Sequence, residues 1–235
     1  MTAVFLSLLG VHTIYALLTN RAETPPKKRK TISIEVVIQL PLFIFACHYG
    51  WEAGVISRQL VSPVYIGLGL LAGHLVFGVS LLITHRSLHD TWSHFFDFGP
   101  LWKYASDSPL VLSRFFSVAV VEELIWRVAA QPLATNLLGN AYLGVTVTAV
   151  LFSIVHRHFF RNTLSVSLEF LAFALLLGGL YQWTGSLILV IVIHAIRDIE
   201  IAYLEYLIKA EELGDEALAA QHVEQTLLRG HPENP

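Results

Sequence analysis

Long apolar stretches alternate with short polar segments along the chain. Most of these stretches have the length that a helix needs to cross a bilayer, about 20 residues. The segment 85–110 interrupts them with polar and aromatic side chains, which is typical of a helix at the membrane surface. Pro132 is expected to end the span that follows this segment. The pattern predicts an all-α, polytopic membrane helical bundle of about seven transmembrane helices, at residues 3–19, 32–50, 63–84, 111–131, 141–158, 165–182 and 187–208.

Composition supports the same fold class. Hydrophobic residues make up 54% of the 235 residues and charged residues 14%, and the mean hydropathy is +0.60. Soluble domains carry about 25% charged residues, so an ordinary soluble protein is excluded. We expect one transmembrane helical domain at 1–209 with a motif-bearing core at 111–205, followed by a polar cytoplasmic tail at 210–235. The single cysteine, Cys47, excludes an internal disulfide.

The basic residues are distributed unevenly between the expected loops. The linker 20–30 holds five of them, whereas the segments expected on the outside hold Arg58 alone. Because Lys and Arg are retained on the cytoplasmic side, we expect the N-terminus outside and the tail in the cytoplasm. The chain is expected to be a multi-pass protein of a bacterial inner (plasma) membrane, with its first apolar stretch retained as a span.

One apolar run, 118–128, contains three charged residues. On a helix, Glu123 and Arg127 are four residues apart and lie on one face, so they can pair and lower the cost of burying both. Glu122 is rotated by about 100° from Glu123, so the same arginine cannot easily neutralise it. This spacing therefore leaves the Glu122 carboxylate available for chemistry.

Two later apolar runs each bring a histidine to membrane depth, His156 and His194. Asp198 follows His194 by one helical turn and can orient its ring. Polar side chains at this depth are costly unless they face partners or water, so they indicate a water-accessible cavity that opens toward the cytoplasm. The other polar residues of the spans are interpreted as structural or interfacial: His12, His48, His74, Glu35, Glu169, Glu200 and Glu205.

Three short motifs follow one another on three of these spans. They read Glu-Glu-x-x-x-Arg at 122–127, Phe-x-x-x-His at 152–156 and His-x-x-x-Asn/Asp at 194–198. In this order they resemble the CAAX-protease and bacteriocin-processing (CPBP, or Abi) family of intramembrane proteases, which is related to the type II CAAX prenyl endopeptidases. The turn Thr184-Gly-Ser-Leu187 before the last span is also similar to the family. The resemblance covers about 111–205.

The resemblance implies an endopeptidase that acts inside the membrane without a covalent acyl-enzyme. Glu122 would be the general base that activates a water, helped by His156. His194 and Asp198 would stabilise the oxyanion of the tetrahedral intermediate. The residues expected to support these side chains are Glu123, Arg127 and Phe152.

Position 198 departs from the asparagine form of the motif, because an ionised aspartate cannot donate a hydrogen bond. Either Asp198 is protonated, or it orients His194 and the histidine donates alone. A third alternative is a two-histidine, two-carboxylate metal site for zinc, formed by Glu122, His156, His194 and Asp198. We expect the metal-free site, with no cofactor.

The expected substrate is a membrane-associated peptide or a prenylated or otherwise lipidated protein, and no nucleic acid is expected as a partner. Two other functions fit the same polar cluster. One is a non-catalytic membrane scaffold or immunity-type factor of the same fold, and the other is a proton or ion carrier. Other intramembrane protease signatures are absent from the sequence, including His-Glu-x-x-His and Gly-x-Ser-x-Gly.

Overall fold

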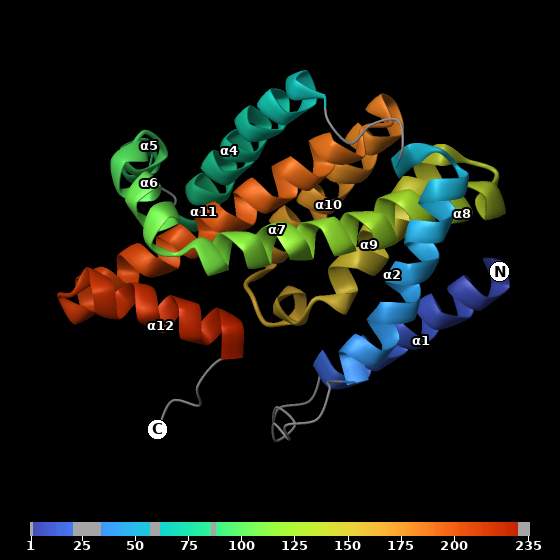
Figure 1. The fold of residues 1–235 in the computed structure, drawn as a ribbon, viewed down its shortest axis with the longest axis horizontal. Helices are drawn as coiled ribbons and strands as arrows, with labels where there is room; N and C mark the ends of the chain where they lie inside the picture. The colour runs from blue at the N-terminus through green and yellow to red at the C-terminus, as the bar shows by residue number, and fades with distance from the viewer. Residues whose placement is uncertain (1, 21–33, 57–61, 86–87, 230–235) are drawn as a thin grey trace. The chain divides into compact units, whose positions relative to one another are not determined.

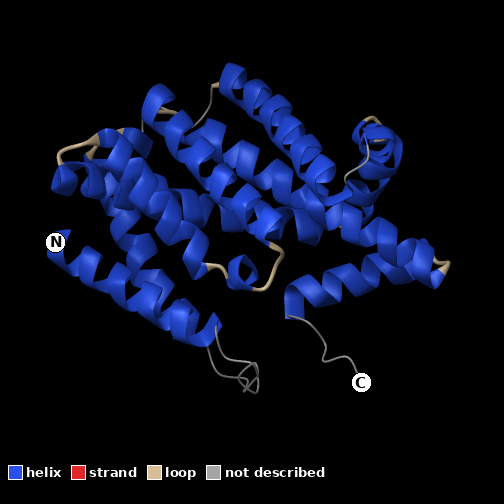
Figure 2. Ribbon diagram, turned by 180° about the vertical axis from the view of Figure 1, so that it is seen from behind, coloured by secondary structure: helices blue, strands red, loops and turns tan. Residues whose placement is uncertain are grey.

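The computed structural model describes residues 2–20, 34–56, 62–85 and 88–229, and every element in these ranges is helical (Figures 1 and 2). The predicted all-α fold class is confirmed. The basic linker expected in the cytoplasm and Arg58 lie outside the described residues. The elements are α1 (Thr2–Asn20), α2 (Ile34–Glu52), α4 (Pro63–His85), α5 (Leu88–Phe95), α6 (Phe98–Asp107), α7 (Pro109–Glu123), the π-helix η1 (Leu124–Ala130), α8 (Gln131–Leu138), α9 (Ala141–Val155), the 3-10 helix η2 (Arg157–Phe160), α10 (Leu164–Thr184), α11 (Leu187–Leu213) and α12 (Glu216–Arg229).

Three of the described helices are long and apolar enough to cross a membrane. They are α1 over Thr2–Thr19, α4 over Pro63–Ile83 and α10 over Leu164–Thr184. The helix α9 is apolar but shorter, at 15 residues. The number of about seven spans stays a prediction.

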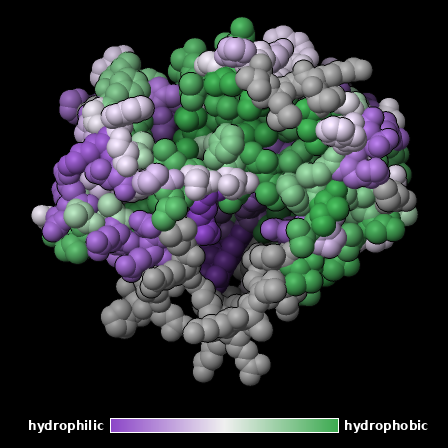
Figure 3. Space-filling model, in the orientation of Figure 1, coloured by the Kyte–Doolittle hydropathy of each residue, from purple (hydrophilic) through white to green (hydrophobic). Residues whose placement is uncertain are grey.

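The exposed faces of these helices are apolar, as expected of a protein that faces lipid. On α4 the exposed residues recur at three- and four-residue spacing, which places them on one side of the helix. Broad hydrophobic areas are visible on the surface in Figure 3. Such a stripe would be costly in water, but lipid solvates it without penalty, so the chain is a membrane protein. The stripe of α4 consists of Val64, Leu68, Leu71, Leu75, Val79 and Leu82.

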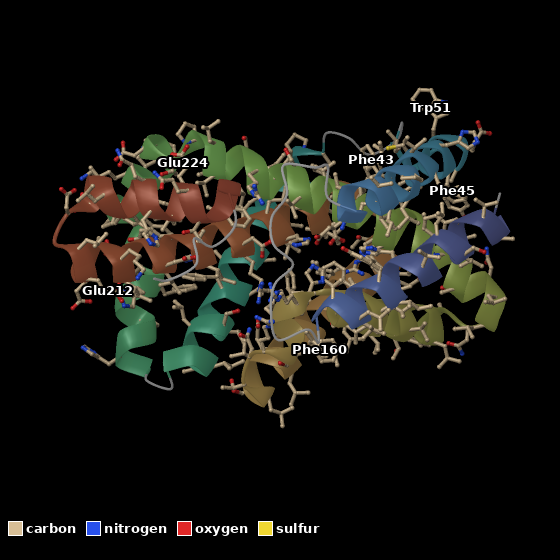
Figure 4. The ribbon with its side chains drawn as sticks, turned by 90° about the horizontal axis from the view of Figure 1, so that it is seen from below. Phe43, Phe45, Trp51, Phe160, Glu212 and Glu224 are labelled. Atoms are coloured by element: carbon tan, nitrogen blue, oxygen red, sulfur yellow. The ribbon has the colours of Figure 1, made fainter. Side chains whose placement is uncertain are left out.

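The chain divides into two compact units. Unit 1 consists of Met1–Tyr65 and Val121–Val190, and unit 2 consists of Ile66–Val120 and Ile191–Pro235. In unit 1, α9 packs against α8 and α10, and α2 packs against both α1 and η1. Figure 1 shows α1 and α2 side by side. Their contact includes Phe45 of α2, labelled in Figure 4, which stacks on Phe5 of α1 with ring centroids 4.6 Å apart.

The expected helix end at Pro132 is wrong, because the helical segment continues through α8 to Leu138. The reason is the π-helix that precedes the proline. In a π-helix each carbonyl pairs with the amide five residues on, as the Gln131 N–H does with the Trp126 carbonyl, so the missing N–H and the ring of a proline are accommodated. The segment ends at Gly139 instead, which has a positive φ of 65°.

Unit 2 contains a second apolar core, to which the predicted tail contributes. The helix α11 runs to Leu213, so the expected domain boundary at residue 209 falls inside it. Gly214, with φ of 64°, makes the turn, and Asp215 accepts hydrogen bonds from the first amides of α12. Figure 4 shows Glu212 and Glu224 at the surface of these two helices. The buried core consists of Tyr104, Val111, Ala202, Tyr203, Tyr206, Ala219 and Val223.

Polar contacts outside the membrane spans help to hold α12 in unit 2. Lys103 of α6 forms an exposed ion pair with Glu216 of α12, and this hydrogen bond raises the pKa of Lys103. Burial raises the pKa of the neighbouring Tyr104 hydroxyl. The tail helix is thus a packed element of unit 2 from Glu216 to Arg229.

Candidate active site

Unit 1 contains a cavity of about 370 Å³. Its walls come from α1, α2, the junction of α7 with η1, and the end of α9. The lining combines titratable and aromatic side chains with aliphatic ones, so water and a polar substrate can both be accommodated. The lining residues are His12, Tyr15, Thr19, Gln39, Leu42, Val121, Glu122, Ile125, Trp126, Val155, His156 and Arg157.

Two of the predicted catalytic residues meet at this cavity. The distance between Glu122 Oε1 and His156 Nε2 is 3.5 Å, and each side chain is 21% exposed. Glu122 lies on the last turn of α7, and His156 directly follows Val155, the last residue of α9. The carboxylate and the imidazole are therefore close enough to share a proton directly or through one water.

His156 is the C-cap of α9 rather than a residue within the helix, because α9 ends at Val155 and not at the expected residue 158. Its backbone is extended, with φ of −86° and ψ of 124°. The ring Nδ1 lies 2.6 Å from the carbonyl oxygen of Phe152. A carbonyl can only accept a hydrogen bond, so Nδ1 carries the proton. The Phe152 carbonyl thus fixes the tautomer and turns Nε2 toward Glu122.

The predicted ion pair between Glu123 and Arg127 is present. Glu123 Oε2 lies 3.0 Å from Arg127 Nε, and both side chains are fully buried. The Arg127 guanidinium also lies over the ring of Phe152, 5.1 Å from its centroid. The ring of Phe152 in turn lies 4.5 Å from that of His156, measured between centroids. The buried pair and His156 are therefore linked through one fully buried aromatic ring, that of Phe152.

The ion pair between Glu123 and Arg127 also explains why the adjacent Glu122 and Glu123 face different surroundings. Glu123 is the last residue of α7 and turns inward, while Glu122 reaches the cavity. The π-helix that begins at Leu124 is entirely buried and packs against α2. Wide π turns are frequent at functional sites, where they change the direction of the side chains around them.

The other two predicted catalytic residues, His194 and Asp198, lie on the part of α11 that belongs to unit 2. His194 Nε2 is 3.4 Å from Asp198 Oδ2, one turn along the helix. The other carboxylate oxygen of Asp198 accepts a hydrogen bond of 3.3 Å from Arg197 Nη1. Asp198 thus lies between His194 and Arg197, and the choice between a protonated Asp198 and one that orients His194 stays a prediction.

Unit 1 offers three potential zinc ligands at the cavity, His12, Glu122 and His156. A catalytic zinc site uses three protein ligands and an open position. No group of three or more His, Cys, Asp or Glu side chains that could hold a metal ion is found within the described part of the chain. The residues of the cavity therefore do not fit zinc by themselves, and the four-ligand alternative stays a prediction.

The sequence pattern missed the contribution of the N-terminal helices to this cavity. His12, interpreted above as structural, lines it together with Tyr15 of α1 and Gln39 of α2. These helices carry none of the motifs, so only the tertiary packing of α1 against α2 and α9 brings His12 to the cavity. The one feature of the sequence that could have indicated this role is the presence of a histidine, His12, inside an apolar span.

Another histidine of the predicted structural group, His74 of α4, is paired in unit 2. Its Nδ1 is 2.7 Å from Glu200 Oε1 of α11. Its ring stacks on Phe95 at a centroid distance of 4.0 Å. This is the environment that a structural histidine is expected to have.

Residues 105–199 match the family model described as type II CAAX prenyl endopeptidase Rce1-like. The match confirms the resemblance drawn from the three motifs and contains all the predicted site residues from Glu122 to Asp198. No curated protein and no solved structure shows a significant match to the chain.

Proposed function

Because residues 105–199 match the model of the type II CAAX prenyl endopeptidases, we propose that the chain is an intramembrane endopeptidase in which Glu122 and His156 activate the water that cleaves the substrate. The family is a protease family and acts on membrane-associated proteins. The finer assignments below are our proposal. The observation that carries it is the approach of Glu122 to His156, 3.5 Å apart at a cavity of about 370 Å³.

The tautomer of His156 determines how the pair handles protons. Nδ1 of His156 donates to the Phe152 carbonyl, so Nε2 of the neutral ring carries a lone pair. Nε2 and the Glu122 carboxylate face each other and can hold one proton between them. The pair can therefore take one proton from a water as the water oxygen bonds to the scissile carbonyl carbon. The same proton then passes to the leaving amide nitrogen as the carbon–nitrogen bond breaks.

Glu123, Arg127 and Phe152 are assigned a positioning role. The fully buried ion pair holds the end of α7 in one rotation, so that the neighbouring Glu122 points into the cavity. Arg127 packs on the Phe152 ring, and the Phe152 carbonyl holds His156. A change at any of these positions is expected to alter the geometry of the catalytic pair without removing it.

His194 and Asp198 are proposed to stabilise the oxyanion, on the strength of their place in the third motif. The contacts of Asp198 with His194 and Arg197 support a charged carboxylate that orients and charge-balances the histidine. His194 then donates to the oxyanion alone. Such a donor in a water-poor site is worth about 100- to 1000-fold in kcat.

We also propose the substrate class and the orientation. The substrate is a prenylated or otherwise lipid-anchored protein that reaches the cavity from the membrane. The N-terminus faces outward and α12 faces the cytoplasm of a bacterial inner membrane. The support for the orientation is the excess of Lys and Arg in the segments expected inside.

The test is cleavage of a fluorogenic farnesylated peptide ending in Cys-Ala-Ala-Met by the purified protein in lipid nanodiscs. Glu122→Gln keeps the shape of the side chain but removes its basicity, so cleavage should fall at least about 1000-fold. The matched control is Glu52→Gln at the exposed end of α2, which should retain wild-type cleavage. Full cleavage by Glu122→Gln would contradict the proposal.

The two other functions predict different results from the same variants. A scaffold would show no cleavage in the wild type and unchanged partner binding in Glu122→Gln. A proton or ion carrier would show flux into proteoliposomes that Glu122→Gln abolishes, with no cleaved product in either protein.

A further inference from the structure

The helix α1 lies outside the family match, yet it forms part of the wall of the cavity that holds Glu122 and His156. His12, Tyr15 and Thr19 of α1 all line this cavity. They are three and four residues apart, which places them on one face of the helix. A polar stripe of the N-terminal helix thus faces the catalytic pair.

The face of α1 next to this stripe, about a quarter turn away, is apolar and exposed, as expected for contact with lipid. Its exposed residues also follow helical spacing, and the buried neighbours of His12 are mostly apolar. A histidine is therefore not needed to fill this interior position, and burying one carries a cost. The exposed residues are Val4, Val11, Ile14 and Leu18, and the buried apolar ones are Phe5, Leu9 and Ala16.

His12 is buried in a way that leaves a polar atom without a partner. Its side chain belongs to a residue that is 6% exposed, and Nδ1 has no hydrogen-bond partner among the described residues. Its neighbour Thr13 is also buried, but the Thr13 hydroxyl donates to the Leu9 carbonyl at 2.8 Å. His74 is paired with Glu200 at 2.7 Å. A structural histidine at position 12 would be expected to have a comparable partner.

We propose that the cavity face of α1 is the substrate-binding wall of the protease, and that His12 hydrogen-bonds the backbone of the peptide segment bound beside Glu122 and His156. An extended peptide presents an N–H and a C=O at each residue, and an imidazole can donate to one or accept from the other. The bound peptide supplies the partner that His12 lacks. This inference rests on the proposed function, because it takes the ligand of the cavity to be the peptide that is cleaved.

The first experiment measures binding without cleavage. A fluorescein-labelled farnesylated peptide ending in Cys-Ala-Ala-Met is titrated with the full chain carrying Glu122→Gln in nanodiscs, and its Kd is read from fluorescence polarisation. Adding His12→Leu should weaken binding about tenfold, since one buried hydrogen bond is lost. Adding His12→Gln, which keeps a donor and an acceptor, should restore Kd to within about threefold. His48→Leu on α2 is the matched control and should leave Kd unchanged.

The second experiment uses the active enzyme. His12→Leu should raise KM about tenfold and leave kcat within about twofold, because the histidine binds substrate without taking part in bond cleavage. It should also leave the Tm equal or higher, since an unpaired buried polar atom is replaced by an apolar group. A side chain that only supports the fold would lower Tm when changed.

Three results would overturn the inference: an unchanged Kd in His12→Leu, a fall in kcat at constant KM, or a loss of binding that accompanies a lower Tm and is not restored by His12→Gln. Failure of the proposed function is a separate outcome. It would appear as full cleavage by Glu122→Gln, whatever the Kd of the His12 variants.

Discussion

The fully buried ion pair between Glu123 and Arg127 allows a stability prediction of definite size. At 3.0 Å the Coulomb attraction is about 5.5 kcal/mol with an effective dielectric constant of about 20. Arg127→Met removes the positive partner and leaves a buried carboxylate uncompensated, which typically costs about 3–5 kcal/mol in the free energy of unfolding. For a chain of this size the Tm should fall by about 6–20 °C.

The two single variants should lose different amounts of unfolding free energy, and the double variant should regain most of that loss. In Glu123→Gln the arginine keeps its cation–π contact with Phe152, worth about 2 kcal/mol when desolvated, so the loss should be smaller than in Arg127→Met. Combining both changes removes both charges, and the double variant should lie within about 2 kcal/mol of the wild type, because only the cation–π contact with Phe152 stays lost.

The single cysteine provides the assay. Cys47 lies on α2, which packs against the π-helix containing Arg127, and its thiol is partly buried. A thiol-reactive fluorogenic dye therefore reports the exposure of Cys47 as the protein is heated in detergent. Additive losses in the double variant, or a Tm of Arg127→Met equal to that of the wild type, would refute the reasoning. The control is Arg114→Met on α7, which is exposed and should change Tm little.

Two further predictions concern the chemistry of the site. Asp198→Asn restores the asparagine form of the motif and should keep cleavage of the farnesylated peptide within about tenfold of wild type, whereas Asp198→Ala should lower kcat about 100-fold; equal activities in both variants would argue against a role in the oxyanion site. Cleavage should persist after treatment with a zinc chelator, measured together with the metal content of the protein, and stoichiometric zinc that is lost in His156→Ala would show instead that a metal is required.

The sequence predicts those parts of the site that depend on local geometry. The four-residue spacing of Glu123 and Arg127 identifies their ion pair, because any helix brings such residues together. The second motif identifies His156 as the partner of Glu122, and the two side chains are 3.5 Å apart. Their catalytic role stays a prediction, and so do the roles of His194 and Asp198.

The parts that the sequence does not predict depend on packing between distant segments. His12 has no motif around it, and its contact with the cavity arises only when α1 packs against α2 and α9. The helix end expected at Pro132 follows a rule for α-helices, which the π-helix before it does not obey. Helical periodicity likewise places His156 inside a span, whereas the structure has it at the cap, where the Phe152 carbonyl holds its ring.

The π-helix also affects how this chain can be aligned with its relatives. A wide turn holds one residue more than the α-helical turn that it replaces, so relatives with and without it differ by a single insertion between Glu123 and Gln131. An ungapped alignment through this stretch would shift every later residue by one position, or about 100° around the helix. The carbonyl contact that Gln131 makes with Gly178, 3.0 Å long, would then be assigned to the wrong neighbour. Homologues should therefore be aligned separately before and after the π-helix, on Glu122 and Glu123 and on Gln131.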